Sequence, residues 1–160
     1  MLICVVIPHY DHLDQFRKSL PSLIEHELPL VVVDDNSPKE VFDALARLLD
    51  EDAPGSTLIR HSGNLGKGGA VMTGLKAALE AGFTHALQVD ADGQHDLEGI
   101  TQLIAETTRQ PKSIICGMPN GKGRRIFGST TALLIQMLRK LTPARTSKRA
   151  GYFIGRKIKF

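Results

Sequence analysis

Short apolar runs alternate with longer segments of helical periodicity through the first 117 residues of the chain. Each run is continuously apolar, a pattern typical of parallel strands that are covered on both faces. Pro8 should end the first run, because proline cannot donate a backbone hydrogen bond to a sheet. We expect strands at residues 2–7, 30–33, 57–60, 85–89 and 113–116.

Four segments between these runs carry apolar residues at helical spacing. In the first, residues 13–24, Pro21 should kink or interrupt the helix, because it removes one backbone hydrogen bond. Ser37 is a candidate N-cap for the second helix. The third and fourth helices should begin near Gly68 and at Asp96.

Strands that alternate with helices of this length predict an α/β fold with right-handed crossovers. The expected architecture is a Rossmann-like, doubly wound and mostly parallel sheet. Ligands of such sheets bind beyond the carboxyl ends of the strands. Polar loops at residues 8–11, 34–37 and 90–95, together with the loop after Arg60, should therefore form one rim.

Composition agrees with one globular domain, because 160 residues with 42% apolar content can bury a sizeable core. The apolar runs are far shorter than the roughly 18 residues that span a bilayer. The N-terminus lacks the basic residues and cleavage site of a secretory signal. We therefore expect a cytoplasmic protein in which Cys4 and Cys116 are free thiols.

Charge is distributed unevenly along the chain. Residues 119–160 contain eleven Lys or Arg and no Asp or Glu, whereas the first 118 residues have a net charge of −8. The basic end is suited to phosphates of lipid or nucleic acid, and its alternative is a solvated segment. Nucleic acid is the weaker interpretation because few aromatic residues are present for base stacking. Residues 126–141 suit either an interfacial helix on anionic lipid or a last core helix.

Two carboxylates, Asp90 and Asp92, follow the strand expected at residues 85–89. Only Ala91 separates them, so both side chains can converge on a hard divalent cation that keeps positions open for phosphate. The alternative is an ordinary acidic turn at the end of a strand.

Glycines surround Lys67 in the stretch from residue 63 to residue 70. Glycines at the start of a helix let backbone amides approach an anion closely, and the lysine can add a positive charge. The stretch matches neither the P-loop nor the dinucleotide-binding fingerprint. A glycine-rich helix start without a ligand is the alternative.

Four motifs follow one another in this order: Pro8-His9-Tyr10, Asp34-Asp35-Asn36-Ser37, Asn64-Leu65-Gly66-Lys67-Gly68 and Asp90-Ala91-Asp92-Gly93-Gln94. In this order and spacing they resemble family 2 glycosyltransferases of the GT-A fold. The last motif is most similar to the polyprenol-phosphate branch, which includes dolichol-phosphate mannosyltransferase. The resemblance covers residues 1–117, the expected nucleotide-sugar-binding domain, and leaves residues 118–160 as a basic segment in place of a longer acceptor region.

The resemblance implies a metal-dependent, inverting glycosyltransferase that uses Mg or Mn. Its donor would be a nucleotide-diphosphate sugar, and its acceptor a polyprenyl phosphate or another membrane-associated molecule. The enzyme would be cytoplasmic, peripheral on the inner face of an anionic membrane. The implied nucleotide-sugar-binding residues are Pro8, Tyr10, Asp35, Lys67, Asp90, Ala91 and Asp92, and the implied metal ligands are Asp90, Asp92 and Gln94.

The chain departs from the family pattern at two places. Asp11 stands where the family commonly has Asn, and the acceptor-binding half with its Gly-Phe-Arg motif is missing, so the chain looks like a shortened or truncated enzyme. No catalytic base is assigned, and a lipid phosphate acceptor would need no strong base because it is already anionic. A non-catalytic nucleotide-sugar-binding remnant and a nucleotidyltransferase are the alternative functions.

Overall fold

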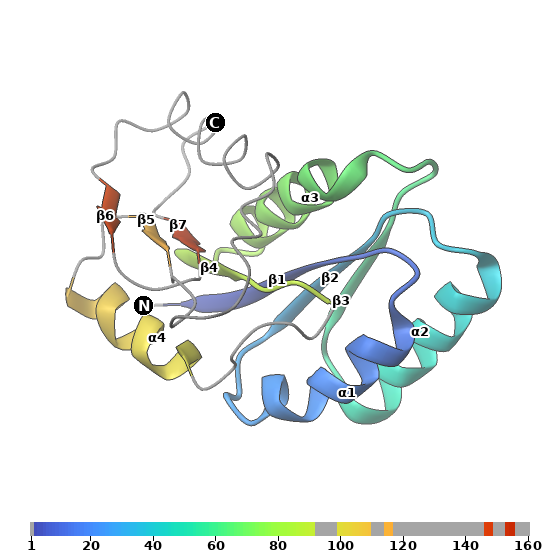
Figure 1. The fold of residues 1–160 in the computed structure, drawn as a ribbon, viewed down its shortest axis with the longest axis horizontal. Helices are drawn as coiled ribbons and strands as arrows, with labels where there is room; N and C mark the ends of the chain where they lie inside the picture. The colour runs from blue at the N-terminus through green and yellow to red at the C-terminus, as the bar shows by residue number, and fades with distance from the viewer. Residues whose placement is uncertain (1, 92–98, 110–113, 117–145, 149–152, 156–160) are drawn as a thin grey trace, which may run out of the picture.

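The computed structural model describes residues 2–91, 99–109, 114–116, 146–148 and 153–155. Within this part, seven strands form one sheet in the order β3-β2-β1-β4-β7-β5-β6 (Figure 1). Neighbouring strands among β1 to β4 are parallel, whereas β7 runs antiparallel to β4 and β5. The expected mostly parallel α/β sheet is confirmed. The strands are β1 Ile3–His9, β2 Leu30–Asp34, β3 Thr57–Arg60, β4 His85–Gln88, β5 Ile114–Cys116, β6 Thr146–Lys148 and β7 Phe153–Gly155.

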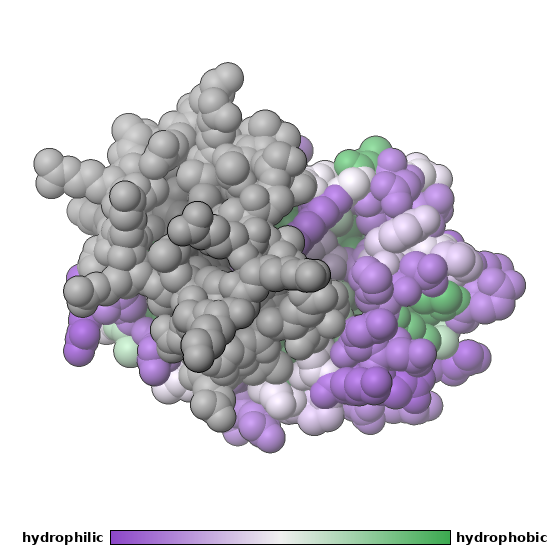
Figure 2. All heavy atoms as spheres, viewed as in Figure 1, coloured by the Kyte–Doolittle hydropathy of each residue, from purple (hydrophilic) through white to green (hydrophobic). Residues whose placement is uncertain are grey.

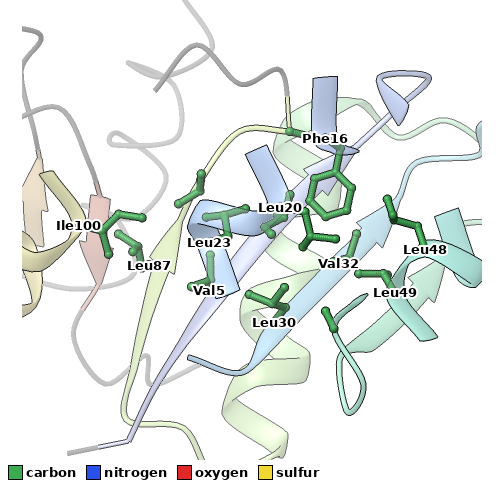
Figure 3. Close-up of a cluster of buried hydrophobic side chains, with 14 of the residues drawn as sticks. Val5, Phe16, Leu20, Leu23, Leu30, Val32, Leu48, Leu49, Leu87 and Ile100 are labelled. Atoms are coloured by element: carbon green, nitrogen blue, oxygen red, sulfur yellow. The ribbon is translucent and has the colours of Figure 1, made fainter. Parts of the chain in front are cut away.

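Helices cover both faces of the sheet. The described helices are α1 Leu13–Ile24, α2 Lys39–Asp52, α3 Gly66–Glu80 and α4 Gly99–Arg109. On one face, Phe16 of α1 and Leu48 of α2 belong to a buried apolar cluster that also includes Leu87 of β4 (Figure 3). On the other face, Leu75 of α3 packs in a second cluster with Val6 of β1. Because successive strand residues point to opposite faces, both clusters together explain why β1 and β2 are buried along their whole length.

The helices on the first face are amphipathic. Each buries one apolar stripe against the sheet and leaves its other side to water, as the sequence pattern predicts. On the face drawn in Figure 2, the described surface over α1 and α2 is mainly hydrophilic. Among the described residues, no helix has both the length and the hydrophobicity that a membrane span requires.

Pro8 lies inside β1, so the expectation that it ends this strand is wrong. The carbonyl of His9 accepts a hydrogen bond from Asp35 on the β2 side, and the carbonyl of Val6 accepts one from Val89 on the β4 side. Even-numbered residues of β1 therefore direct their backbone groups toward β4. Since β4 ends at Gln88, opposite Val6, the missing N–H of Pro8 removes no bond of this ladder.

Pro21 does not interrupt α1, which continues to Ile24, so the expected interruption is wrong. Pro21 lies on the exposed side of the helix, while Leu20 and Leu23 are buried at 1% exposure. Because Pro21 has no N–H, the carbonyl of Arg17 lacks its intrahelical partner, and water can bind it on this exposed side. The buried leucines hold the last turn of the helix against the sheet.

The starts of the other helices differ from the sequence expectation. Ser37 does not cap α2: its Oγ accepts a hydrogen bond from the backbone N–H of Asp11 at 3.0 Å, and no side chain caps the helix. Helix α3 begins at Gly66, two residues earlier than expected, and α4 is described from Gly99 onward. The fourth start expected at Asp96 and the helix expected at 126–141 lie outside the described residues.

The sheet includes strands from both sides of residue 117. Strand β7 lies between β4 and β5, where Ile154 is opposite both Leu87 and Ile115. Strand β6 pairs in parallel with β5. Strands β6 and β7 of the C-terminal segment thus belong to the same sheet as β1 to β5. That residues 118–160 form a separate acceptor region stays a prediction.

Candidate functional site

A pocket of about 330 Å³ opens at the carboxyl ends of β1, β2 and β4 and at the start of α3. All four loops of the expected rim contribute to it, so this expectation is confirmed. The pocket contains six of the seven predicted nucleotide-sugar-binding residues; Asp92, and with it the predicted metal ligand Gln94, lies outside the described residues. The lining residues are Pro8, His9, Tyr10, His12, Asp35, Asn64, Gly66, Lys67, Ala70, Asp90 and Ala91.

The strand order explains why the pocket forms there. From β1 the chain proceeds outward to β2 and β3, and then returns to the other side of β1 as β4. The connections that leave β1 and precede β4 therefore diverge, which leaves a crevice above these two central strands. Sequence periodicity alone does not give this order, although it does place polar residues at each strand end.

Asp35 is a buried carboxylate in the pocket wall. Its Oδ1 accepts a hydrogen bond from the backbone N–H of Leu65 at 2.8 Å and lies 2.7 Å from Nδ1 of His61. The other ring nitrogen of His61 lies 2.8 Å from Oγ1 of Thr73. His61 was not among the residues predicted from sequence, and the available signal was its position directly after the third strand.

Asp34 is fully buried behind the pocket and anchors the rim from the opposite face of the sheet. Its carboxylate lies 3.3 Å from Nδ1 of His9 and accepts a hydrogen bond from the N–H of Ser37 at 3.1 Å. Arg60 approaches the same carboxylate at 3.6 Å, and its guanidinium also lies over the Phe42 ring. These contacts hold the ends of β1, β2 and β3 together.

The surroundings of His9 favour its neutral form. Burial lowers the pKa of His9 below its ordinary value of 6.5, and the neighbouring Asp34 opposes this shift in part. Because the Asp34 carboxylate only accepts hydrogen bonds, the proton of the neutral ring belongs on Nδ1. The buried Nε2 has no hydrogen-bond partner among the residues that the structure describes.

Lys67 and Asp90 face one another across the pocket. Nζ of Lys67 lies 2.5 Å from Oδ2 of Asp90, and the side-chain amide of Gln88 donates to Oδ1 of Asp90 at 2.6 Å. Lys67 belongs to the first turn of α3, where the helix dipole also favours an anion. Lys67 and the start of α3 thus place positive charge on this side of the pocket, and the Asp90 carboxylate balances part of it.

Backbone geometry accounts for the residue types at two rim positions. Gly66 has a φ of 77°, which glycine adopts without steric cost, and α3 begins there. Asp11 has a φ of 54°. Among residues other than glycine, Asp and Asn enter this left-handed region most readily, which suits Asp11 to this position.

The predicted metal site is only partly within the described residues. Those residues contain no group of three or more His, Cys, Asp or Glu that could hold a metal ion. Asp90 offers a carboxylate at the pocket, which is the ligand chemistry that Mg and Mn prefer. Lys67 contacts Oδ2 of this carboxylate, so its ammonium competes with a cation that uses the same oxygen.

The comparison with protein families decides the assignment. A sequence model described as glycosyl transferase family 2 matches residues 4–156. The chain belongs to this family. The resemblance inferred from the four motifs is thereby confirmed.

Two curated proteins are similar in sequence to this family 2 chain. The chain is 30% identical over 128 residues to the UDP-N-acetylglucosamine–dolichyl-phosphate N-acetylglucosaminyltransferase of Methanococcus voltae, covering 72% of this chain and 51% of that protein. It is 28% identical over 145 residues to the undecaprenyl-phosphate mannosyltransferase of Micrococcus luteus, covering 89% and 59%. The chain thus spans about half the length of these curated relatives.

Solved structures agree on the fold of this family 2 chain. Residues 1–349 of S. aureus TarS superpose with a TM-score of 0.61 at 22% identity, covering 79% of this chain and 38% of that one. A mannosyltransferase from Pyrobaculum calidifontis, solved with GDP-Man and Mn²⁺, gives a TM-score of 0.61 at 20% identity, covering 80% and 37%. These similarities confirm the expected fold class.

Proposed function

We propose that the chain transfers a sugar from a nucleotide-diphosphate donor to a polyprenyl phosphate or another membrane-associated acceptor. The observation that supports this most is the convergence of residues from four separate segments on one pocket at the sheet's rim. Family membership supports the same reaction class. A pocket of about 330 Å³ is within the size range of small-ligand sites.

In this proposal the two sides of the pocket bind different parts of the donor. Pro8 and Tyr10 line the nucleobase subsite, and Asp35 accepts a hydrogen bond from the base or the ribose. Lys67 and the N-terminus of α3 attract the diphosphate. Ala91 and Asp90 contact the ribose and diphosphate from the β4 side.

Asp90, Asp92 and Gln94 would hold Mg or Mn. When bound, the cation stabilises the negative charge that develops on the departing nucleoside diphosphate. The mannosyltransferase of P. calidifontis, which was solved with GDP-Man and Mn²⁺, supports the use of a divalent metal.

The acceptor in this proposal is a lipid phosphate, as in the names of both curated relatives. A phosphate oxygen of the acceptor forms a bond to the anomeric carbon while the bond from that carbon to the donor diphosphate breaks. Attack from the face opposite the leaving group inverts the configuration. Because the phosphate is already anionic at neutral pH, no side chain has to remove a proton.

The C-terminal segment, residues 118–160, is the proposed acceptor region. Its excess of Lys and Arg suits the anionic inner face of a cytoplasmic membrane. Co-sedimentation with phosphatidylglycerol vesicles tests this part: we expect binding that weakens with salt, and absence of binding at moderate salt contradicts it.

Donor binding is tested by titration calorimetry with UDP-GlcNAc and GDP-mannose, with and without Mn²⁺. We expect the parent protein to bind one of these donors more tightly with Mn²⁺, and Asp92→Ala to lose this metal dependence while keeping the parent's unfolding midpoint. Asp50→Ala, an exposed carboxylate on α2, is the matched control and should bind like the parent. Failure of the parent to bind any nucleotide sugar contradicts the proposal.

Transfer is tested separately from binding, because the chain spans about half the length of its curated relatives. The donor that binds is incubated with Mn²⁺ and undecaprenyl phosphate, and the glycolipid is measured by mass spectrometry. Formation of glycolipid supports the transferase proposal. Binding without transfer instead supports a nucleotide-sugar-binding role for this chain.

A further inference from the structure

His61 connects the pocket to the middle of α3. It is the first residue after β3, and its side chain is 9% exposed. Nδ1 of His61 lies 2.7 Å from Oδ1 of Asp35, and Nε2 lies 2.8 Å from Oγ1 of Thr73. The imidazole therefore joins a carboxylate of the pocket wall to a hydroxyl on the helix whose first turn also lines the pocket.

The chemistry of the two partners assigns the proton on this ring. An ionised carboxylate only accepts hydrogen bonds, so Nδ1 of His61 donates to Asp35. The unprotonated Nε2 then accepts a hydrogen bond from the hydroxyl of Thr73. Both nitrogens of a neutral imidazole are satisfied in this arrangement, and a rotation of the ring breaks both bonds.

The same oxygen of Asp35 accepts a second hydrogen bond, from the backbone N–H of Leu65 at 2.8 Å. Two groups of the β3–α3 segment thus contact Oδ1, and neither His61 nor Leu65 lines the pocket. Among the described residues, the other oxygen, Oδ2, accepts no hydrogen bond, and Asp35 lines the pocket. A ligand N–H or O–H group would therefore meet Oδ2.

We propose that His61 is a positioning residue that sets the orientation of the Asp35 carboxylate and keeps Oδ2 available to the nucleoside part of the donor. This inference rests on the proposed function and deepens it. Without the imidazole, the carboxylate keeps only the Leu65 donor and can rotate within its site. Thr73 acts one step further away, because it holds the ring rather than the carboxylate.

The test compares ligands that differ in whether they reach Asp35. UDP and GDP carry a nucleoside, whereas inorganic pyrophosphate has only the part that Lys67 and the start of α3 attract. In calorimetry with Mn²⁺, we expect His61→Ala to lower the affinity for the preferred nucleoside diphosphate about tenfold and to leave the affinity for pyrophosphate unchanged. A tenfold loss corresponds to one well-oriented hydrogen bond to a charged group.

Two further variants separate positioning from general damage. His61→Asn keeps a side-chain N–H near the place of Nδ1, so we expect it to restore most of the nucleotide affinity. Thr73→Val removes the hydroxyl at nearly constant volume and should weaken nucleotide binding less than His61→Ala does. In an Asp35→Ala background, His61→Ala should have no further effect on nucleotide affinity, because the group that it positions is gone.

Equal losses of nucleotide and pyrophosphate affinity in His61→Ala contradict the inference, as does an unchanged nucleotide affinity. If His61→Ala does not fold, Thr73→Val carries the same comparison of nucleotide with pyrophosphate affinity. A parent that binds no nucleotide contradicts the proposed function instead. The ¹⁵N spectrum of the His61 ring then tests the arrangement without ligand: a proton on Nδ1 supports it, and a proton on Nε2 alone contradicts it.

Discussion

Lys67 and Asp90 form an ion pair across the pocket, with 2.5 Å between Nζ and Oδ2, although 23 positions separate them in the chain. The Lys67 side chain is 45% exposed, so the pair contributes little to the stability of the fold. Its importance lies in the pocket, where the ammonium faces both the expected diphosphate and a carboxylate of the expected metal site.

Replacing Lys67 should change two affinities in opposite directions. We expect Lys67→Met to weaken binding of a nucleoside diphosphate about tenfold, because one charge-assisted contact to phosphate is lost. The same change should strengthen binding of Mn²⁺ alone, because the ammonium no longer competes for Asp90. Separate calorimetric titrations measure both, with Lys76→Met, an exposed lysine later in α3, as control. Affinities that change in the same direction contradict this interpretation.

Gly74 lies where α3 packs closely on β1 and β2. A Cβ atom at this position would lie 2.4 Å from Cγ1 of Val6 and 3.3 Å from Cγ2 of Val33. We expect Gly74→Ala to lower the free energy of unfolding by about 1–3 kcal/mol, the usual cost of overpacking a core. Urea denaturation followed by circular dichroism measures this change.

Gly68→Ala is the matched control for Gly74→Ala, since both residues lie in α3. Apart from its chain neighbours and the nearby backbone of its own helix, no heavy atom of the described residues would lie within 4 Å of a Cβ at Gly68. Alanine should therefore stabilise the helix there by up to about 1 kcal/mol. If the two variants are equally stable, the close packing of α3 on β1 and β2 is wrong.

His9 should make the protein less stable in mild acid. Burial lowers its pKa, so the folded state binds fewer protons than the unfolded state once the pH falls below about 6.5. The free energy of unfolding should consequently fall as the pH decreases from 7 to 5. Denaturation at several pH values should show a shallower dependence for His9→Asn, which cannot titrate, than for the parent. The control is His26→Gln. If the free energy of unfolding of His9→Asn depends on pH as steeply as that of the parent, this contribution of His9 is contradicted.

Cys4 should be unreactive in the folded protein. Its side chain is fully buried, and desolvation raises the pKa of the thiol to about 12. Because the thiolate is the reactive form, a Cys116→Ser variant should react very slowly with Ellman's reagent at pH 8 and rapidly in urea. Fast labelling under native conditions would show that this part of β1 opens readily.

Local sequence determined most of the central architecture. Residues covered on both faces are mostly apolar, so the runs at β1 and β2, which are buried throughout, could be recognised directly. Strand β3 has the predicted bounds although its residues are exposed or only partly buried. The residues that follow these strands, such as Asp35 and Asp90, could be selected because parallel strands place their carboxyl ends along one edge. These predictions use only the spacing of residues along the chain.

Only the tertiary structure decided which groups are partners across the sheet. Pro8 stays within β1 because β4 ends before it, and His61 reaches Asp35 because β3 lies beside β2. Likewise, Ser37 accepts a bond from Asp11 instead of capping α2. The physical reason is that each of these contacts depends on the side-by-side order of elements distant in sequence, whereas hydrophobic periodicity reports only whether a residue is buried.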